Sequence, residues 1–231
     1  MKNKSLQLQP RLQMLADLVP PGARLADIGT DHGYLPVWLL SQGKISSAVA
    51  ADIAADPLDH ARRTAEEYAV HENLTFRLCD GLQGLSLQDA DTLVIAGMGG
   101  ETIVHILSQA DWCREAKLLL LQPMTKSELL RSWLTENGYT IQQERLVRDK
   151  AYLYPILLVT GGNCAPLTAA EVYCGVNNQS DPLFPEYLQQ RLQRLDKIME
   201  GLSNSREAEV QSRAEDLRQL KQELMDREGV Q

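Results

Sequence analysis

From Arg24 to about Thr160, short runs of apolar and β-branched residues alternate with segments whose apolar residues recur every three or four positions. The short runs are typical of buried strands, and the longer segments are typical of amphipathic helices. A regular alternation of the two predicts an α/β fold, in which helices cover both faces of a mostly parallel sheet. The expected strands are Arg24–Ile28, Ser47–Asp52, Leu74–Leu78, Thr92–Ala96 and Lys117–Gln122.

Two of the intervening helices carry recognisable signals at their ends. Asp56 stands directly before Pro57, an order that predicts an N-cap followed by a proline at the first helical position. Thr125 and Glu128 have the spacing of a capping box at the start of a second helix, and Gly138 is a typical stop signal at its end.

Two further strand-like runs, Tyr139–Val147 and Ala151–Val159, follow one another directly. The residues between them, 148–150, are too few for a crossover helix, so the two runs are expected to form an antiparallel hairpin. A parallel core that ends in an antiparallel hairpin is the arrangement of Rossmann-like class I methyltransferase sheets.

The pattern changes after Gly162. Residues 186–231 show no strand pattern, and apolar residues recur there at steps of three and four, which predicts a coiled-coil-like helical hairpin with an interruption at Gly201–Ser205. We therefore expect a cofactor-binding domain over residues 1–162 and a helical domain over residues 163–231. The two predicted seams are Leu188, Leu192, Leu195, Met199 and Leu202 on one helix, and Val210, Ala214, Leu217, Leu220 and Leu224 on the other.

Composition narrows the class of protein. The formal net charge of −8 argues against a large polyanionic partner, although a local basic strip can coexist with an acidic remainder. The four cysteines lie far apart and no histidine stands at a metal-ligand spacing, so neither a disulfide framework nor a metal is expected. Because no apolar run approaches the roughly 20 residues of a membrane span, and residues 1–9 do not read as a signal peptide, we expect a cytoplasmic protein without membrane contact.

The loop after the first expected strand carries the pattern D-x-G-x-x-x-G, formed by Asp27, Gly29 and Gly33. Glycines let the backbone turn tightly and approach a ligand closely at the carboxyl edge of a parallel sheet. A dinucleotide site requires G-x-G-x-x-G, and Asp27 and His32 occupy two of those glycine positions. An acidic residue at this place suits a ligand with a cationic amino-acid end, such as S-adenosylmethionine. The alternative is an ordinary strand-to-helix turn.

Later loops supply further cofactor candidates. Asp52 lies about 20 residues beyond the glycine turn, where a carboxylate can accept both ribose hydroxyls, unless it only caps the next helix. Asp80 suits the adenine amino group, unless Asp80 and Gly81 only form a turn. The glycines after Ala96 line the same edge, unless they only allow a close helix entrance. The expected cofactor contacts are Asp27, Gly29, Thr30, Gly33, Asp52, Ile53, Asp80, Gly81, Ala96, Gly97, Met98 and Gly99.

Four features together resemble a known family: the segment Asp27–Pro36, the loop Ala96–Gly100, the stretch Leu121–Met124 that leads to Leu130–Leu134, and the helical C-terminal extension. They are similar to those of the bacterial tRNA (adenine-N1)-methyltransferases of the TrmK family, which act on adenine 22. The resemblance implies a class I methyltransferase fold, S-adenosylmethionine as the methyl donor, tRNA as the acceptor, and a C-terminal domain that assists tRNA recognition.

The resemblance also directs attention to the first loop as the place of chemistry. Adenine N1 has an in-plane lone pair, so the enzyme mainly has to position the reactants and hold the base out of its stack. Asp31, His32 and Tyr34 are expected beside the transferable methyl group. Asp31 would accept from the adenine amino group, Tyr34 would stack or donate, and His32 would orient the base or the donor. The alternative is that all three only contact the cofactor or pack.

Basic residues outside this loop are candidates for contacts with tRNA. Arg11 is expected to reach the donor carboxylate or a tRNA phosphate, and Lys126, Arg131, Arg145, Arg148 and Lys150 are expected to form a phosphate-facing strip. Exposed charges without a partner are the alternative for all of them.

Two other functions stay open at this point. The first is a methyltransferase that acts on a small molecule and uses the C-terminal helices as a lid or dimer contact; the acidic net charge favours it. The second is a non-catalytic module that binds the donor and recruits a protein partner, against which the full set of polar loop residues argues. We expect a monomer.

Overall fold

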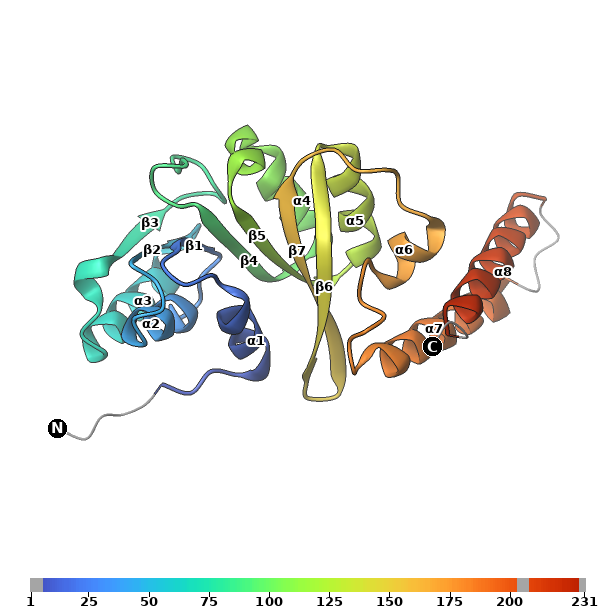
Figure 1. Ribbon diagram of the computed structural model, residues 1–231, viewed down its shortest axis with the longest axis horizontal. Helices are drawn as coiled ribbons and strands as arrows, with labels where there is room; N and C mark the ends of the chain where they lie inside the picture. Colours follow the sequence, from blue (N-terminus) through green and yellow to red (C-terminus); the bar gives the residue numbers. More distant parts are fainter. Residues whose placement is uncertain (1–5, 203–207, 229–231) are drawn as a thin grey trace.

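The computed structural model describes residues 6–202 and 208–228, in which seven strands form one mixed sheet (Figure 1). The strands are β1 (Arg24–Ile28), β2 (Ser47–Asp52), β3 (Leu74–Leu78), β4 (Thr92–Gly99), β5 (Leu118–Thr125), β6 (Tyr139–Asp149) and β7 (Tyr152–Gly161). Their order across the sheet is β3-β2-β1-β4-β5-β7-β6. The first five strands pair in parallel, and β7 pairs antiparallel with both β5 and β6. The predicted parallel core with a terminal hairpin is confirmed.

Both faces of the central strands are buried, which explains their nearly continuous apolar sequences. Alternate residues enter opposite cores: Leu93 packs in one core and Val94 in the other, as do Leu119 and Leu120. The helices of the N-terminal half cover one face, and those between β4 and β6 cover the other. The helices are α1 (Pro10–Leu18), α2 (Tyr34–Ser41), α3 (Ala55–Glu67), α4 (Gly100–Ser108) and α5 (Ser127–Glu136), with short 3₁₀ turns η1 (His71–Asn73) and η2 (Asp111–Glu115).

The expected helix caps were wrong in detail. Helix α3 begins at Ala55, one residue before Asp56, because the Asp52 carboxylate accepts a hydrogen bond of 2.8 Å from the Ala54 backbone nitrogen and fixes the turn. Helix α5 begins at Ser127 and has no side-chain cap. Glu128 cannot complete the predicted capping box, since its carboxylate forms an ion pair with Arg191.

The C-terminal region forms α6 (Ala169–Cys174), α7 (Phe184–Leu202) and α8 (Ala208–Glu228). Figure 1 shows α7 and α8 side by side as an antiparallel pair that extends away from the sheet. Leu188, Leu195 and Leu224 are fully buried between them, so the predicted helical hairpin is confirmed, while most of the expected interruption lies outside the described residues.

The core of the C-terminal helices continues onto the strand hairpin. Leu146 of β6 and Leu153 of β7 pack in the same cluster as the buried residues of α6, α7 and α8. The helical region is therefore seated on the end of the β6–β7 hairpin rather than attached by a linker, and the expected boundary between residues 162 and 163 stays a prediction. None of the described helices is long and apolar enough to cross a membrane.

Candidate active site

The site lies between the neighbouring strands β1 and β4, where the strand order of the sheet reverses. From this point β2 and β3 follow on one side, and β5 follows on the other. In open parallel sheets, ligands bind outside the carboxyl ends of the strands at this point. A cavity of about 480 Å³ opens there, with the loop after β1 on one side and Ala96 and Gly97 of β4 on the other. Of the expected cofactor residues, Asp27, Gly29, Thr30, Gly33, Ala96 and Gly97 line it.

Two glycines make the first loop possible. Gly29 has a φ of +74°, and a Cβ at this position would overlap the methyl group of Met98. Gly33 has a φ of +65°, and a Cβ there would lie 2.9 Å from the Cβ of Ala61 in α3. The backbone nitrogens of Gly29 and Thr30 both donate to the Ala51 carbonyl oxygen, which ties the loop to β2. The glycine pattern therefore reflects both backbone conformation and close helix packing.

Polar groups at the base of the cavity suit a cationic ligand. Asp27 is only 9% exposed, and burial raises the pKa of its carboxyl group to about 6. The side chain of Thr30 partly offsets this shift by hydrogen bonding to the carboxyl group, and the negative charge of Asp52 adds to it. A buried acid beside a hydroxyl group fits the cationic amino-acid end of S-adenosylmethionine.

The other expected cofactor residues do not line this cavity. Asp52 and Ile53 lie at the carboxyl end of β2, and Asp80 and Gly81 lie just beyond the end of β3. The β3 loop is held beside β2 because the Cys79 backbone nitrogen donates to the Asp52 carbonyl oxygen over 3.0 Å. The sequence interpretation missed Leu78, although a leucine at a strand end beside a cofactor loop was a usable signal. Ile53 and Leu78 are 69% and 63% exposed, as apolar walls for an adenine ring would be.

For the glycines at the end of β4, the structure supports in part the alternative that they only allow a helix to enter close to the sheet. A Cβ on Gly100 would overlap the backbone carbonyl of Lys126, and a Cβ on Gly99 would lie 3.2 Å from the Thr125 hydroxyl oxygen. These two glycines are therefore required by the close entry of α4 beside β5. Gly97 differs, because it borders the cavity and has a φ of +77°.

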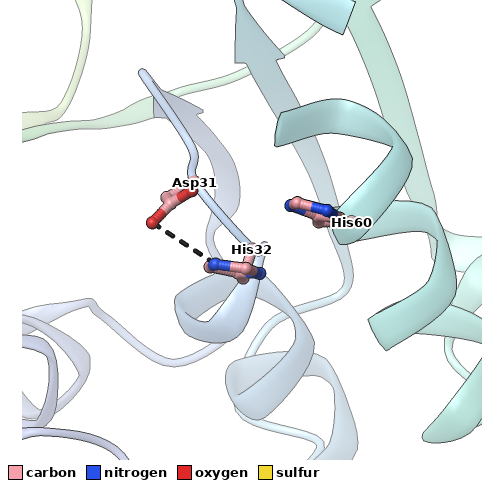
Figure 2. A group of neighbouring side chains, drawn as sticks. All are labelled: Asp31, His32 and His60. Carbon is pink, nitrogen blue, oxygen red and sulfur yellow. Dashed lines mark ion pairs between the residues drawn. The ribbon is translucent and has the colours of Figure 1, made fainter. Parts of the chain in front are cut away.

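Asp31, His32 and Tyr34 all line the cavity. Figure 2 shows His60 of α3 beside His32 and Asp31. The His32 ring stacks on Tyr34 at a centroid distance of 5.1 Å and on His60 at 4.8 Å. The Asp31 carboxylate lies 3.5 Å from Nε2 of His32. The sequence interpretation missed His60, because its place depends on how α3 packs against Gly33.

The same cluster contains three groups that can ligate a metal, Asp31, His32 and His60. An imidazole nitrogen binds a metal in the plane of its ring. The two imidazole rings lie face to face at an interplanar angle of 7°, so in this arrangement their nitrogens do not converge on one point. The cluster is therefore a stack of rings open to solvent.

Arg11 lines the cavity but is held firmly by the protein. Its Nε donates to the Asp149 carboxylate over 2.5 Å, and Nη1 donates to Oε1 of Gln122 over 3.0 Å. The same oxygen of Gln122 accepts from the Gly97 backbone nitrogen over 3.1 Å. Gln122, which the sequence interpretation missed as a site residue, is completely buried and links the guanidinium to the β4 loop. The alternative of a freely solvated Arg11 is excluded, and its expected contact with the donor carboxylate or a tRNA phosphate stays a prediction.

The expected phosphate-facing strip is wrong for Arg131. Its side chain is completely buried and forms two hydrogen bonds of 2.8 Å with the Glu144 carboxylate, so no phosphate can reach it. Lys126 and Arg148 are exposed, but they form ion pairs with Glu101 and Glu186. Arg145 pairs with Asp181 over 3.2 Å. The strip is partly neutralised by carboxylates that the sequence pattern did not reveal.

Comparison with known proteins shows the family of this chain. Residues 8–157 match the family model of the methyltransferase domain. The tRNA (adenine(22)-N(1))-methyltransferase of Bacillus subtilis is 35% identical over 159 residues, which cover 68% of this chain and 67% of the relative. The solved structure of the B. subtilis m1A22 tRNA methyltransferase TrmK has a TM-score of 0.84 at 29% identity, with 95% of this chain and 99% of that one covered.

A Streptococcus pneumoniae structure, a putative tRNA (m1A22) methyltransferase in complex with S-adenosyl-L-methionine, has a TM-score of 0.81 at 31% identity and covers 93% of this chain and 97% of its own. Fold and site thus define a class I S-adenosylmethionine-dependent methyltransferase. Within that class, the chain belongs to the tRNA (adenine(22)-N1)-methyltransferase family.

Proposed function

We propose that this protein transfers a methyl group from S-adenosylmethionine to N1 of an adenine in tRNA, at the position of adenine 22. The observation that carries the proposal is the composition of one cavity. Its base holds the buried Asp27 and Thr30, and its mouth holds the exposed Asp31, His32 and Tyr34. The activity of the B. subtilis relative supports the choice of acceptor.

The donor would be held by the residues at the base of the cavity and at the ends of β2 and β3. Asp27, when ionised, would face the cationic amino-acid end, and the buried Thr30 would lie beside it. Asp52 would accept from the ribose hydroxyls with the carboxylate oxygen not occupied by Ala54, while Ile53 and Leu78 would enclose the adenine. Bound there, the donor supplies an electrophilic sulfonium methyl group.

The acceptor adenine would lie at the mouth of the cavity. Since N1 already carries an in-plane lone pair, no residue has to remove a proton before attack, and positioning is the main task of the protein. Tyr34 is 41% exposed, and its ring stacks on that of His32. The ring is therefore held in place and can stack on a base that is turned out of the RNA helix. The exposed Asp31 carboxylate is free to accept from the adenine amino group, which would raise electron density at N1.

The proposal is tested with purified protein, labelled S-adenosylmethionine and two tRNA transcripts that differ only at position 22, one with adenine and one with guanine. We expect 1-methyladenosine, identified by mass spectrometry of the nucleosides, only in the first transcript. Equal labelling of both transcripts, or of neither, would contradict the proposed acceptor. Because the proposed substrate is tRNA, we also propose a cytoplasmic location.

A methyltransferase that acts on a small molecule is the alternative that the net charge of −8 favours. It predicts donor binding with no labelling of either transcript, together with label in a low-molecular-weight fraction of a cell extract. The same assay therefore separates the two functions.

A further inference from the structure

A second cavity, of about 450 Å³, lies at the same edge of the sheet as the first. It is formed by the carboxyl end of β5, the start of the antiparallel strand β7, and α7, and we call it the hairpin–helix cavity. Figure 1 shows the end of the β6–β7 hairpin beside the first turns of α7. Its polar and aromatic lining includes Lys126, Tyr152, Tyr154, Gln190, Arg191 and Arg194.

The charge of this cavity is opposite to that of the whole protein. Its lining contains three cations, Lys126, Arg191 and Arg194, and one carboxylate, Glu128, which is paired with Arg191. Arg194 is exposed and makes no ion pair within the described residues. Lys126 pairs with Glu101 outside the lining, so Arg194 is the cation of this lining that has no carboxylate partner among the described residues. In a chain with a net charge of −8, such an unpaired cation beside two others favours an anionic ligand.

Arg191 lines the cavity but is a buried residue that its neighbours hold in place. It is 8% exposed, its guanidinium lies 3.9 Å from the centroid of the Tyr173 ring, and its Nη2 donates to the Tyr173 carbonyl oxygen over 2.9 Å. Its Nε is buried and has no partner among the described residues. A buried guanidinium with one donor unsatisfied holds a concentrated positive charge at the wall of the cavity, which favours an anionic ligand there.

An exposed aromatic side chain adds a second kind of recognition. Tyr152 is 65% exposed, and its ring lies 6.2 Å from that of Tyr154 at an interplanar angle of 45°. Aromatic rings beside arginines are the usual means by which proteins hold unpaired nucleotides, with the base stacked and the phosphate bound by the cations. Phosphate alone would not require the exposed ring.

The side chain of Arg11 lies between the hairpin–helix cavity and the active-site cavity. Arg11 lines the active-site cavity, and its guanidinium lies 5.7 Å from the centroid of the Tyr154 ring. Its Nη1 also lies 3.6 Å from the sulfur of Met124, which lines the second cavity. Because one side chain separates the two cavities, neighbouring nucleotides of one RNA strand can reach both.

We propose that the hairpin–helix cavity binds an unpaired nucleotide of the RNA substrate next to the target adenine. The base stacks on Tyr152, and its phosphate contacts Arg194 and the exposed part of the Arg191 side chain. The inference rests on the proposed function and deepens it, because it assigns a specific RNA contact to the junction between the sheet and the C-terminal helices.

The test uses the full chain and a fluorescently labelled tRNA transcript, with binding followed by anisotropy at several salt concentrations. Tyr152→Ala is expected to weaken binding about tenfold, the order of magnitude of one lost base stack, and Tyr152→Trp is expected to restore it. Arg194→Gln should weaken binding several-fold and lower the slope of log Kd against log salt by about one. Lys117→Ala, which removes an exposed cation at the opposite edge of the sheet, is the matched control and should bind like wild type.

Each variant is also titrated with S-adenosylmethionine, whose affinity should stay unchanged. Equal RNA affinity for Tyr152→Ala and Lys117→Ala would overturn the inference. Weakening by Arg194→Gln alone would also overturn the stacked nucleotide, because it would indicate a simple anion contact. If Tyr152→Ala loses RNA binding while the wild type methylates no adenine, the cavity remains a nucleotide site and only the proposed reaction fails.

Discussion

Individual side chains in the active-site cavity have environments that the sequence motif could not show. The D-x-G-x-x-x-G pattern identified Asp27 as a cofactor contact, but its raised pKa depends on burial beneath the loop and on the neighbouring carboxylate of Asp52. Similarly, His32 was predicted at the reactive edge, whereas its stacking on His60 requires α3 to approach Gly33 closely. The motif therefore predicted which residues lie at the site, but it did not predict their burial, their pKa values or their stacking partners.

The raised pKa of Asp27 predicts a pH-dependent affinity for the donor. Below a pKa of about 6 the carboxyl group is protonated and loses its attraction for a cationic ligand. The Kd for S-adenosylmethionine should therefore increase as the pH falls, by roughly tenfold one unit below that pKa. Calorimetric titrations between pH 5 and pH 8 check this, with Asp27→Asn as the comparison. The explanation fails if the variant shows the same pH dependence as the wild type.

Asp31 should affect turnover rather than donor binding, since its side chain is 81% exposed at the mouth of the cavity. Asp31→Ala is expected to lower kcat roughly tenfold or more, the range for one lost hydrogen bond to a charged group, while the Kd for the donor stays within several-fold. Asp59→Ala, which removes an exposed carboxylate on α3, serves as control. Equal losses of turnover and donor affinity would assign Asp31 to the cofactor.

At the scale of helices and strands, apolar periodicity predicted much more than the cap signals did. The limits of β1 and β2 agree with the expected runs because strands buried on both faces have continuous apolar sequences, and the limits of the edge strand β3 agree as well, although most of its residues are not buried. The starts of α3 and α5 were missed because backbone turns set them, one through Asp52 and one through Lys126, whose φ is +54°. Side-chain type at a helix start is a weaker signal than these tertiary constraints.

The ion pair between Arg131 of α5 and Glu144 of β6 is another contact that the sequence did not predict. Its partner Glu144 lies on β6, and both are buried where α5 meets the strand and α6: Arg131 Nη1 donates to the Val172 carbonyl oxygen, and Glu144 accepts from the Val176 backbone nitrogen. No local pattern distinguishes such an arginine from an exposed one on a helix. The pair therefore fastens the C-terminal helices to the sheet.

This arrangement makes a prediction about stability. Arg131→Met leaves Glu144 buried without its partner, and the free energy of unfolding should fall by about 3–5 kcal/mol. Arg218→Met, which breaks an exposed ion pair with Glu215 on α8, should cost at most about 1 kcal/mol. Urea denaturation of the two variants measures the difference. Similar losses would show that the buried pair has no special structural role.

At the scale of the whole molecule, net charge alone gave a misleading indication. The value of −8 argued against an RNA partner, yet cations gather at the carboxyl edge of the sheet in the hairpin–helix cavity, where the C-terminal helices meet the β6–β7 hairpin. The cations are Lys126, directly after β5, and Arg191 and Arg194 of α7, which are far apart in sequence, so only the fold brings them together. The fold class and the helical extension, in contrast, followed from patterns within single segments.

The central claim is that the cavity between β1 and β4 accepts a sulfonium nucleoside rather than a pyrophosphate cofactor. Calorimetric titration of the wild-type chain with S-adenosylmethionine and, separately, with a nicotinamide dinucleotide tests it most directly. We predict saturable binding of S-adenosylmethionine that Asp27→Asn weakens, and no binding of the dinucleotide. Binding of the dinucleotide by the folded protein, with no uptake of S-adenosylmethionine, would contradict the assignment of the site.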